Sequence, residues 1–110
     1  MRLQRVDEHL KEKLRDPYFR ELHELEEQKI SIVKRIIEHR IKKSLSQKDF
    51  AKQVGVTQQH ISKIENGEFS NISTLERVLL FIGLTVRMSA VPIPNNTRSR
   101  VFRMTHSKKA

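Results

Sequence analysis

Apolar residues recur every three or four positions through the middle of the chain, the spacing that places them on one face of an α-helix. This period predicts four successive helices, with apolar faces formed by Val33, Ile36, Ile37 and Ile41, by Phe50, Ala51 and Val54, by Ile61 and Ile64, and by Leu75, Val78, Leu79 and Ile82. After Gly83 the period changes to two, with apolar residues at Leu84, Val86, Met88 and Ala90. The pattern therefore predicts an all-α bundle followed by a short β-strand.

Polar caps and a glycine delimit the two short central helices. Ser46 caps the first, and Asp49, three residues later, completes a capping box. Gly55 suits the left-handed conformation of an abrupt turn, and Thr57 caps the second helix. A helical-wheel count at about 100° per residue gives the second helix a polar outer face of Gln59, Ser62, Lys63 and Asn66, with Gln58 near its edge. This arrangement is typical of a helix-turn-helix, whose second helix enters the DNA major groove.

Helical segments are also expected before this region. Residues 7 to 16 are charged and helix-prone, and Asp16-Pro17 predicts a new helix with Asp as its N-cap. That helix extends to about Gln28. Ser31 can either cap a fresh helix or lie inside a long one, and we expect a break or a bend there.

The last predicted helix and the strand belong together. Ser73 with Glu76 forms a capping box for the helix that Gly83 ends. The strand, residues 84–91, needs a partner, and no other segment has a strong strand pattern. The same strand of a second subunit is the expected partner, which predicts a homodimer with interface residues Leu84, Val86 and Met88.

The stretch from Leu45 to Gly67, LSQKDFAKQVGVTQQHISKIENG, resembles the Cro and λ-repressor-like family of helix-turn-helix regulators. The likeness covers roughly residues 31–83 and implies a λ-repressor-like bundle. It also implies an ion pair between Arg40 and Glu65 within the scaffold. By position, it assigns a phosphate contact to Gln47 and base contacts to Gln58, Gln59 and Lys63. The chemistry agrees, since glutamine pairs with adenine and lysine donates to guanine. The full predicted DNA-binding set is Ser46, Gln47, Thr57, Gln58, Gln59, Ser62, Lys63 and Asn66.

Composition supports a polyanionic partner. The 110 residues include 22 Lys and Arg against 13 Asp and Glu, a net charge of +9. Residues 1–30 carry a net −1 and residues 31–110 a net +10, so the positive charge accompanies the helix-turn-helix. The sequence has no cysteine, no Gly-rich phosphate loop, no nucleophile elbow and no His constellation for a metal. We therefore expect no enzyme activity, cofactor or metal, no membrane association, and a location in the cytoplasm on the nucleoid.

The N-terminal segment has an apolar row at Leu10, Leu14, Tyr18, Leu22 and Leu25. This row either packs on the core or docks another protein. DPYFR, at residues 16–20, resembles the N-terminal extension of HigA-type antitoxins, and the strand resembles the dimerising strand of HipB-type antitoxins. The resemblance implies a protein toxin as a possible partner, bound by Tyr18, Phe19, Leu22 and Leu25.

The expected organisation is an N-terminal helical extension (1–30), a DNA-binding domain (31–83), a dimerisation strand (84–91) and a flexible basic tail (92–110). The tail can be a solvated end, an arm on DNA phosphates, or a second strand returning along the first. The predicted function is a transcriptional repressor that binds a palindromic double-stranded operator and is the antitoxin of a toxin-antitoxin operon. A free-standing prophage-type or host regulator is the alternative, and a protein-interaction adaptor that has lost DNA contact is a third.

Overall fold

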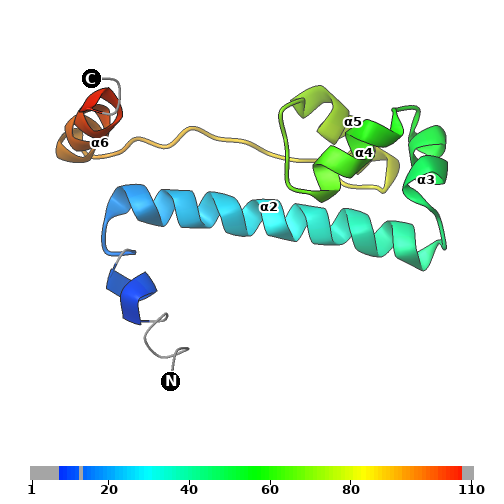
Figure 1. The fold of residues 1–110 in the computed structure, drawn as a ribbon, viewed down its shortest axis with the longest axis horizontal. Helices are drawn as coiled ribbons and strands as arrows, with labels where there is room; N and C mark the ends of the chain where they lie inside the picture. Colours follow the sequence, from blue (N-terminus) through cyan, green and yellow to red (C-terminus); the bar gives the residue numbers. More distant parts are fainter. Residues whose placement is uncertain (1–7, 13, 108–110) are drawn as a thin grey trace. The chain divides into compact units, whose positions relative to one another are not determined.

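A computed structural model of the chain describes residues 8–12 and 14–107, with side chains up to residue 104. Residues 8–12 are helical, and the following helices are α2 (Pro17–Lys42), α3 (Gln47–Val54), α4 (Gln58–Glu65), α5 (Ile72–Phe81) and α6 (Asn95–Ser107) (Figure 1). The chain divides into two compact units, one of residues 28–88 and one combining residues up to 27 with those from 89 onward. The prediction of a mainly helical chain is confirmed.

The unit of residues 28–88 has a single apolar core. It is formed by buried side chains from α2 to α5, namely Ile36, Phe50, Ala51, Val54, Ile61, Ile64, Leu75, Val78 and Leu79. The predicted inward faces of α3, α4 and α5 are confirmed, with Ile82 partly buried against them. On α2 the inward side differs from the expected one, because Ile32 packs beside Ile36 whereas Ile41 is 61% exposed.

Local capping fixes where α3 and α4 begin. The Ser46 hydroxyl accepts a hydrogen bond from the Asp49 amide at 3.0 Å, and the Thr57 hydroxyl accepts one from the His60 amide at 3.2 Å. Gly55, at φ +86°, takes the left-handed conformation between the two helices. All three predicted roles are confirmed. Each cap provides an acceptor for an amide that has no partner within its helix.

The start of α5 differs from the prediction. Asn71, not Ser73, is the N-cap, and its side-chain oxygen accepts a hydrogen bond from the Thr74 amide at 3.0 Å. Asn is at least as good a cap as Ser, and its earlier position starts the helix at Ile72. Glu76, expected in a capping box, is therefore available for a different contact.

Glu76 forms hydrogen bonds to the segment that follows α5. Its carboxylate accepts hydrogen bonds from the Thr85 hydroxyl at 2.8 Å and the Val86 amide at 3.4 Å. Leu84 and Val86 pack on the core of their own chain. No described residue forms a β-strand, so the strand expected over residues 84–91 is not supported. Of the period-two pattern, Leu84 and Val86 pack on the core, whereas Met88 and Ala90 are exposed. Glu76 occupies the Val86 amide, which strand pairing would use.

Two further expectations are corrected. The break or bend at Ser31 is absent, since α2 is continuous through this exposed serine. Residues 95–107, expected as part of a flexible tail, form α6, and Thr97 is buried at 5% exposure. A helix with a buried side is ordered by its packing, which composition alone does not predict. The remaining predicted parts of the extension (1–7) and tail (108–110) lie outside the described residues.

Asp16 connects the two sequence segments of the second unit. Its carboxylate caps α2, accepting a hydrogen bond from the Tyr18 amide at 3.0 Å, as predicted for Asp16-Pro17. It also forms an ion pair with Arg100 on α6. None of the described helices is long and apolar enough to cross a membrane.

The pKa of Asp16 is expected below its ordinary value of 3.8. The hydrogen bond from Arg100 lowers this pKa most; burial opposes it, and the Tyr18 amide contributes a smaller lowering. The ion pair should therefore persist as pH falls past 3.8 and be lost as pH falls through the lowered pKa. NMR titration of the carboxyl should show this, and Arg100→Gln should raise the midpoint toward 3.8. Arg103→Gln is the matched control, and equal midpoints in both variants would contradict the assignment.

Candidate nucleic-acid interface

The outer face of α4 carries exposed polar side chains. Gln58, Gln59 and Lys63 are exposed, whereas Ile61 and Ile64 are buried against α3 and the rest of the core. The remaining members of the set predicted on or beside α4 are Thr57 and Asn66, exposed at its two caps, and Ser62, which is partly buried. The helical spacing thus places the amides and the ammonium group on the side of α4 that the core leaves open.

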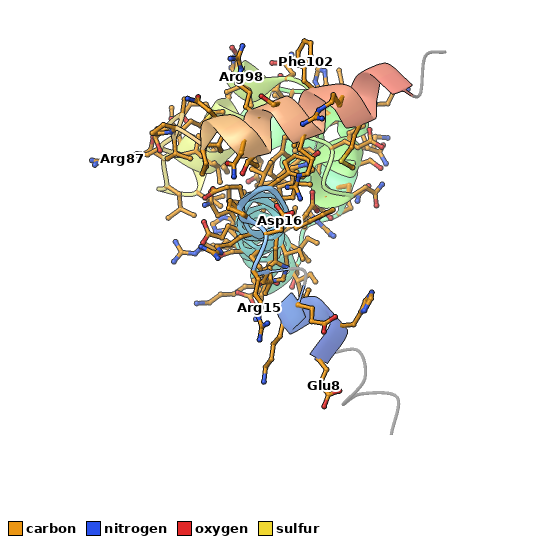
Figure 2. All side chains as sticks on the ribbon, turned by 90° about the vertical axis from the view of Figure 1, so that its left-hand side faces the viewer. Glu8, Arg15, Asp16, Arg87, Arg98 and Phe102 are labelled. Atoms are coloured by element: carbon orange, nitrogen blue, oxygen red, sulfur yellow. The ribbon has the colours of Figure 1, made fainter. Side chains whose placement is uncertain are left out.

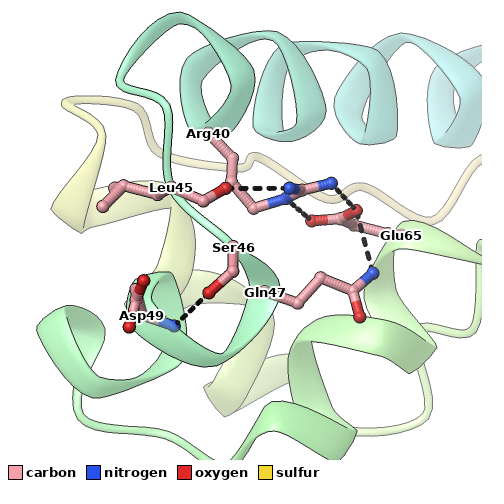
Figure 3. Close-up of polar contacts among 6 residues, drawn as sticks. All are labelled: Arg40, Leu45, Ser46, Gln47, Asp49 and Glu65. Atoms are coloured by element: carbon pink, nitrogen blue, oxygen red, sulfur yellow. Dashed lines mark hydrogen bonds and ion pairs between the residues drawn. The ribbon is translucent and has the colours of Figure 1, made fainter.

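Gln47 is more constrained than the sequence suggested. Its amide nitrogen donates a hydrogen bond to Glu65 at 3.2 Å, and the residue is partly buried (Figure 3). Ser46, beside it, is exposed and uses its hydroxyl as the cap of α3. The start of α3 is therefore fixed both by a cap and by a side-chain contact to the end of α4.

Arg40 and Glu65 form the ion pair that the sequence predicted. Two nitrogens of the Arg40 guanidinium donate to the two carboxylate oxygens of Glu65, at 2.8 and 2.9 Å. A third donates to the Leu45 carbonyl at 3.0 Å (Figure 3). Hydrogen bonding to Glu65 raises the pKa of Arg40. One guanidinium thus ties α2 to the loop before α3 and to the last turn of α4, in the fork geometry that favours arginine over lysine.

A polar hollow lies beside the start of α4, and the sequence did not predict it. Its lining comes from the turn, from α4 and from the start of α5: Gly55, Val56, Thr57, His60, Asn71, Ser73, Thr74 and Arg77. The N-terminal ends of α4 and α5 both contribute to it, and helix N-termini favour anions. The N-terminal ends of these two helices and the Arg77 guanidinium together suit a phosphate oxygen. The hollow exists only because α5 folds back on the turn, so no local pattern predicts it.

Comparison with known proteins bears on this surface. Residues 36–87 match the model of a family described as helix-turn-helix. The match indicates a helix-turn-helix of the Cro/C1 type at these residues. The match supports a DNA-binding transcription regulator. No curated protein and no solved structure matched the chain.

The segment that matches the family model, residues 36–87, begins and ends four to five residues later than the predicted domain of residues 31–83. The matched segment passes the expected boundary at residue 83 and includes Leu84 and Val86, which pack on the core. It lies wholly within the compact unit of residues 28–88. The segment predicted as a separate dimerisation strand thus begins inside the domain. Among the described residues, no group of three or more His, Asp or Glu side chains could hold a metal ion.

The predicted partner-binding residues lie outside the helix-turn-helix domain, on the first turns of α2. The rings of Tyr18 and Phe19 are partly buried, with centroids 5.4 Å apart. Leu22 is 40% exposed and Leu25 is 49% exposed. The two leucines thus offer apolar surface.

Arg77 braces the turn of the helix-turn-helix domain. Its Nε donates to the Val54 carbonyl at 3.0 Å, where α3 ends. A Cβ atom added at Gly55 would lie 2.9 Å from Nη2 of Arg77. Gly55 therefore meets two demands, a left-handed backbone and room for the guanidinium.

Gly55→Ala should destabilise the domain more than Gly67→Ala. Both glycines have a positive φ, +86° and +85°, but nothing lies within 4 Å of a Cβ at Gly67. Each variant should lose about 1–2 kcal/mol through its backbone, and Gly55→Ala about 0.5 kcal/mol more, because the end of the Arg77 side chain must shift and weaken its hydrogen bond to the Val54 carbonyl. Urea denaturation measures the free energies of unfolding. In an Arg77→Ala background the extra loss should disappear, and a difference that persists there would refute the contact.

Proposed function

We propose that the chain is a sequence-specific repressor that places α4 in the DNA major groove. The observation that carries this proposal is the exposed outer face of α4, where Gln58, Gln59 and Lys63 lie together on a helix held from behind by the core. Base reading requires donors and acceptors that are free to reach the groove but fixed in position by their scaffold. Glutamine amides select adenine, and the Lys63 ammonium selects guanine.

The supporting groups around α4 would hold the phosphate backbone. Gln47 uses its amide nitrogen to bond Glu65, and a primary amide has a second N–H with which to reach a phosphate oxygen. Ser46 and Thr57 lie at helix N-termini, where DNA phosphates are favourably bound. Ser62 and Asn66 complete the proposed contact set along α4. Arg77, in the hollow beside α4, is an additional phosphate donor that the sequence reasoning missed.

We place the repressor on DNA as a homodimer. Two copies of α4 about 34–36 Å apart would match the half-sites of a palindromic operator. Leu84 and Val86 pack on their own core, but Met88, beyond them, is 71% exposed. The proposed dimer contact is therefore centred on Met88 and the segment after it, where Val91 is 56% exposed.

Removing a base-reading side chain should reduce sequence discrimination. Gln59→Ala and Lys63→Ala should each lose about 1–3 kcal/mol of preference for a duplex selected by the protein from a random pool over a scrambled duplex. Gln28→Ala and Lys34→Ala, at exposed positions of α2, are the matched controls. Fluorescence anisotropy titrations at one salt concentration measure the preference. Wild-type discrimination retained by both α4 variants would defeat the proposal.

We further propose that the repressor is the antitoxin of a toxin-antitoxin operon and represses its own promoter. The support is the described unit outside the helix-turn-helix domain, whose exposed Leu22 and Leu25 offer an apolar docking surface for a small toxin. Tyr18 and Phe19, adjacent on the same helix, extend that surface. Base reading by α4 does not involve this unit.

A stoichiometric toxin should co-purify with the chain when the gene for this chain and the gene beside it are expressed together. Leu22→Asp combined with Leu25→Asp should abolish co-purification, because burying a carboxylate in an apolar contact is strongly unfavourable. Glu21→Gln with Glu24→Gln, on exposed positions of the same helix, is the matched control. A chain that binds its operator but retains no partner would instead be a free-standing regulator.

A further inference from the structure

Positive charge is unbroken at the C-terminal end of the sequence. After Glu76 there is no Asp or Glu, but there are seven Lys and Arg residues: Arg77, Arg87, Arg98, Arg100, Arg103, Lys108 and Lys109. Three of the seven, Arg98, Arg100 and Arg103, lie on α6. Because α6 follows Glu76, it carries no acidic side chain of its own.

The two sides of α6 differ. Thr97 is 5% exposed on the inner side, and Arg100 pairs with the Asp16 carboxylate. Arg98 precedes Arg100 by two residues, a rotation of about 200° on a helix. Figure 2 accordingly shows Arg98 and Phe102 on the side of α6 turned away from Asp16. The Asp16 contact therefore orients α6 so that Arg98 is directed outward.

A second exposed arginine flanks the same side. Arg98, Ser99, Phe102 and Arg103 line a shallow hollow on α6. The Arg103 Nε donates to the Ser99 carbonyl at 3.5 Å, an uncharged acceptor that fixes the side chain without neutralising it. The outward face of α6, defined by these four residues, thus presents two guanidinium groups and a hydroxyl. Phosphate oxygens are the acceptors that such donors fit best.

We propose that the outward face of α6 binds DNA phosphates without regard to sequence, as a second contact beside the helix-turn-helix domain. This inference rests on the proposed DNA-binding function. The compact unit of residues 28–88 ends at Met88 and α6 begins at Asn95, so the connection between them reaches at most about 25 Å. A short tether keeps α6 at a high effective concentration near DNA bound by α4. Two arginine–phosphate contacts are then enough to strengthen DNA binding.

The salt dependence of DNA binding tests this proposal. Three proteins are titrated with the selected duplex and the scrambled duplex over a range of salt concentrations. They are the wild-type chain, Arg98→Gln/Arg103→Gln and Arg98→Lys/Arg103→Lys. The glutamine variant should lower the slope of log K against log salt by about one unit per arginine, equally on both duplexes. The lysine variant retains the charge and should keep the wild-type slope. Circular dichroism establishes that α6 is retained in each variant.

The outcomes separate this inference from the function on which it rests. An unchanged slope in the glutamine variant, with discrimination between duplexes intact, overturns the α6 contact and leaves the repressor proposal standing. A glutamine variant that weakens the selected duplex alone also overturns it, because a phosphate contact acts on every sequence. A wild-type chain that binds neither duplex overturns the proposed function, and the α6 contact with it.

Discussion

The position of α4 depends on the bidentate ion pair between Arg40 and Glu65. The Glu65 side chain is only 7% exposed, so its charge requires a partner that is fixed in place. Replacing a buried ion pair by apolar residues can leave stability unchanged, and the value of such a pair is often its geometry. Here the geometry is informative, because the same guanidinium also bonds the Leu45 carbonyl, and the same carboxylate also bonds Gln47. Three elements are thus positioned by one pair of side chains.

Such a clamp is needed because the helices it joins are short. α3 and α4 have eight residues each, too few to be stable alone in water. Their caps satisfy the first amides, and the core supplies the remaining stability through Phe50, whose ring lies 6.1 Å from that of His39 and 6.0 Å from that of Phe81. Packing therefore holds the inner face of α4, and the ion pair fixes its end. The outer face of α4 takes no part in this packing or in the ion pair, so Gln58, Gln59 and Lys63 are available to contact bases.

Sequence patterns predicted the helix-turn-helix domain well because its determinants are local. Ser46, Gly55 and Thr57 act on residues within four positions of themselves, and their roles follow from capping and backbone conformation. The N-cap of α5 was mispredicted locally, because Asn71 precedes Ser73 and caps the helix first. Other failures arose where a distant residue decides. Thr97 and the Asp16–Arg100 pair place α6 against a segment more than eighty residues away. Arg77 reaches the turn of the helix-turn-helix across 23 positions, which no spacing along the chain reveals.

Glu76 and Arg77 are consecutive on α5, yet they bond two different segments of the domain. The carboxylate holds the departing chain at Thr85 and Val86, while the guanidinium holds the turn after Val54. One residue inserted in the first turn of α5 would rotate both by about 100°, placing Glu76 where Arg77 now lies. The Glu76 carboxylate would then approach the hollow that suits a phosphate, and Thr85 and Val86 would lose their hydrogen-bond acceptor. The phase of this one helix is therefore fixed by charge as well as by its apolar residues.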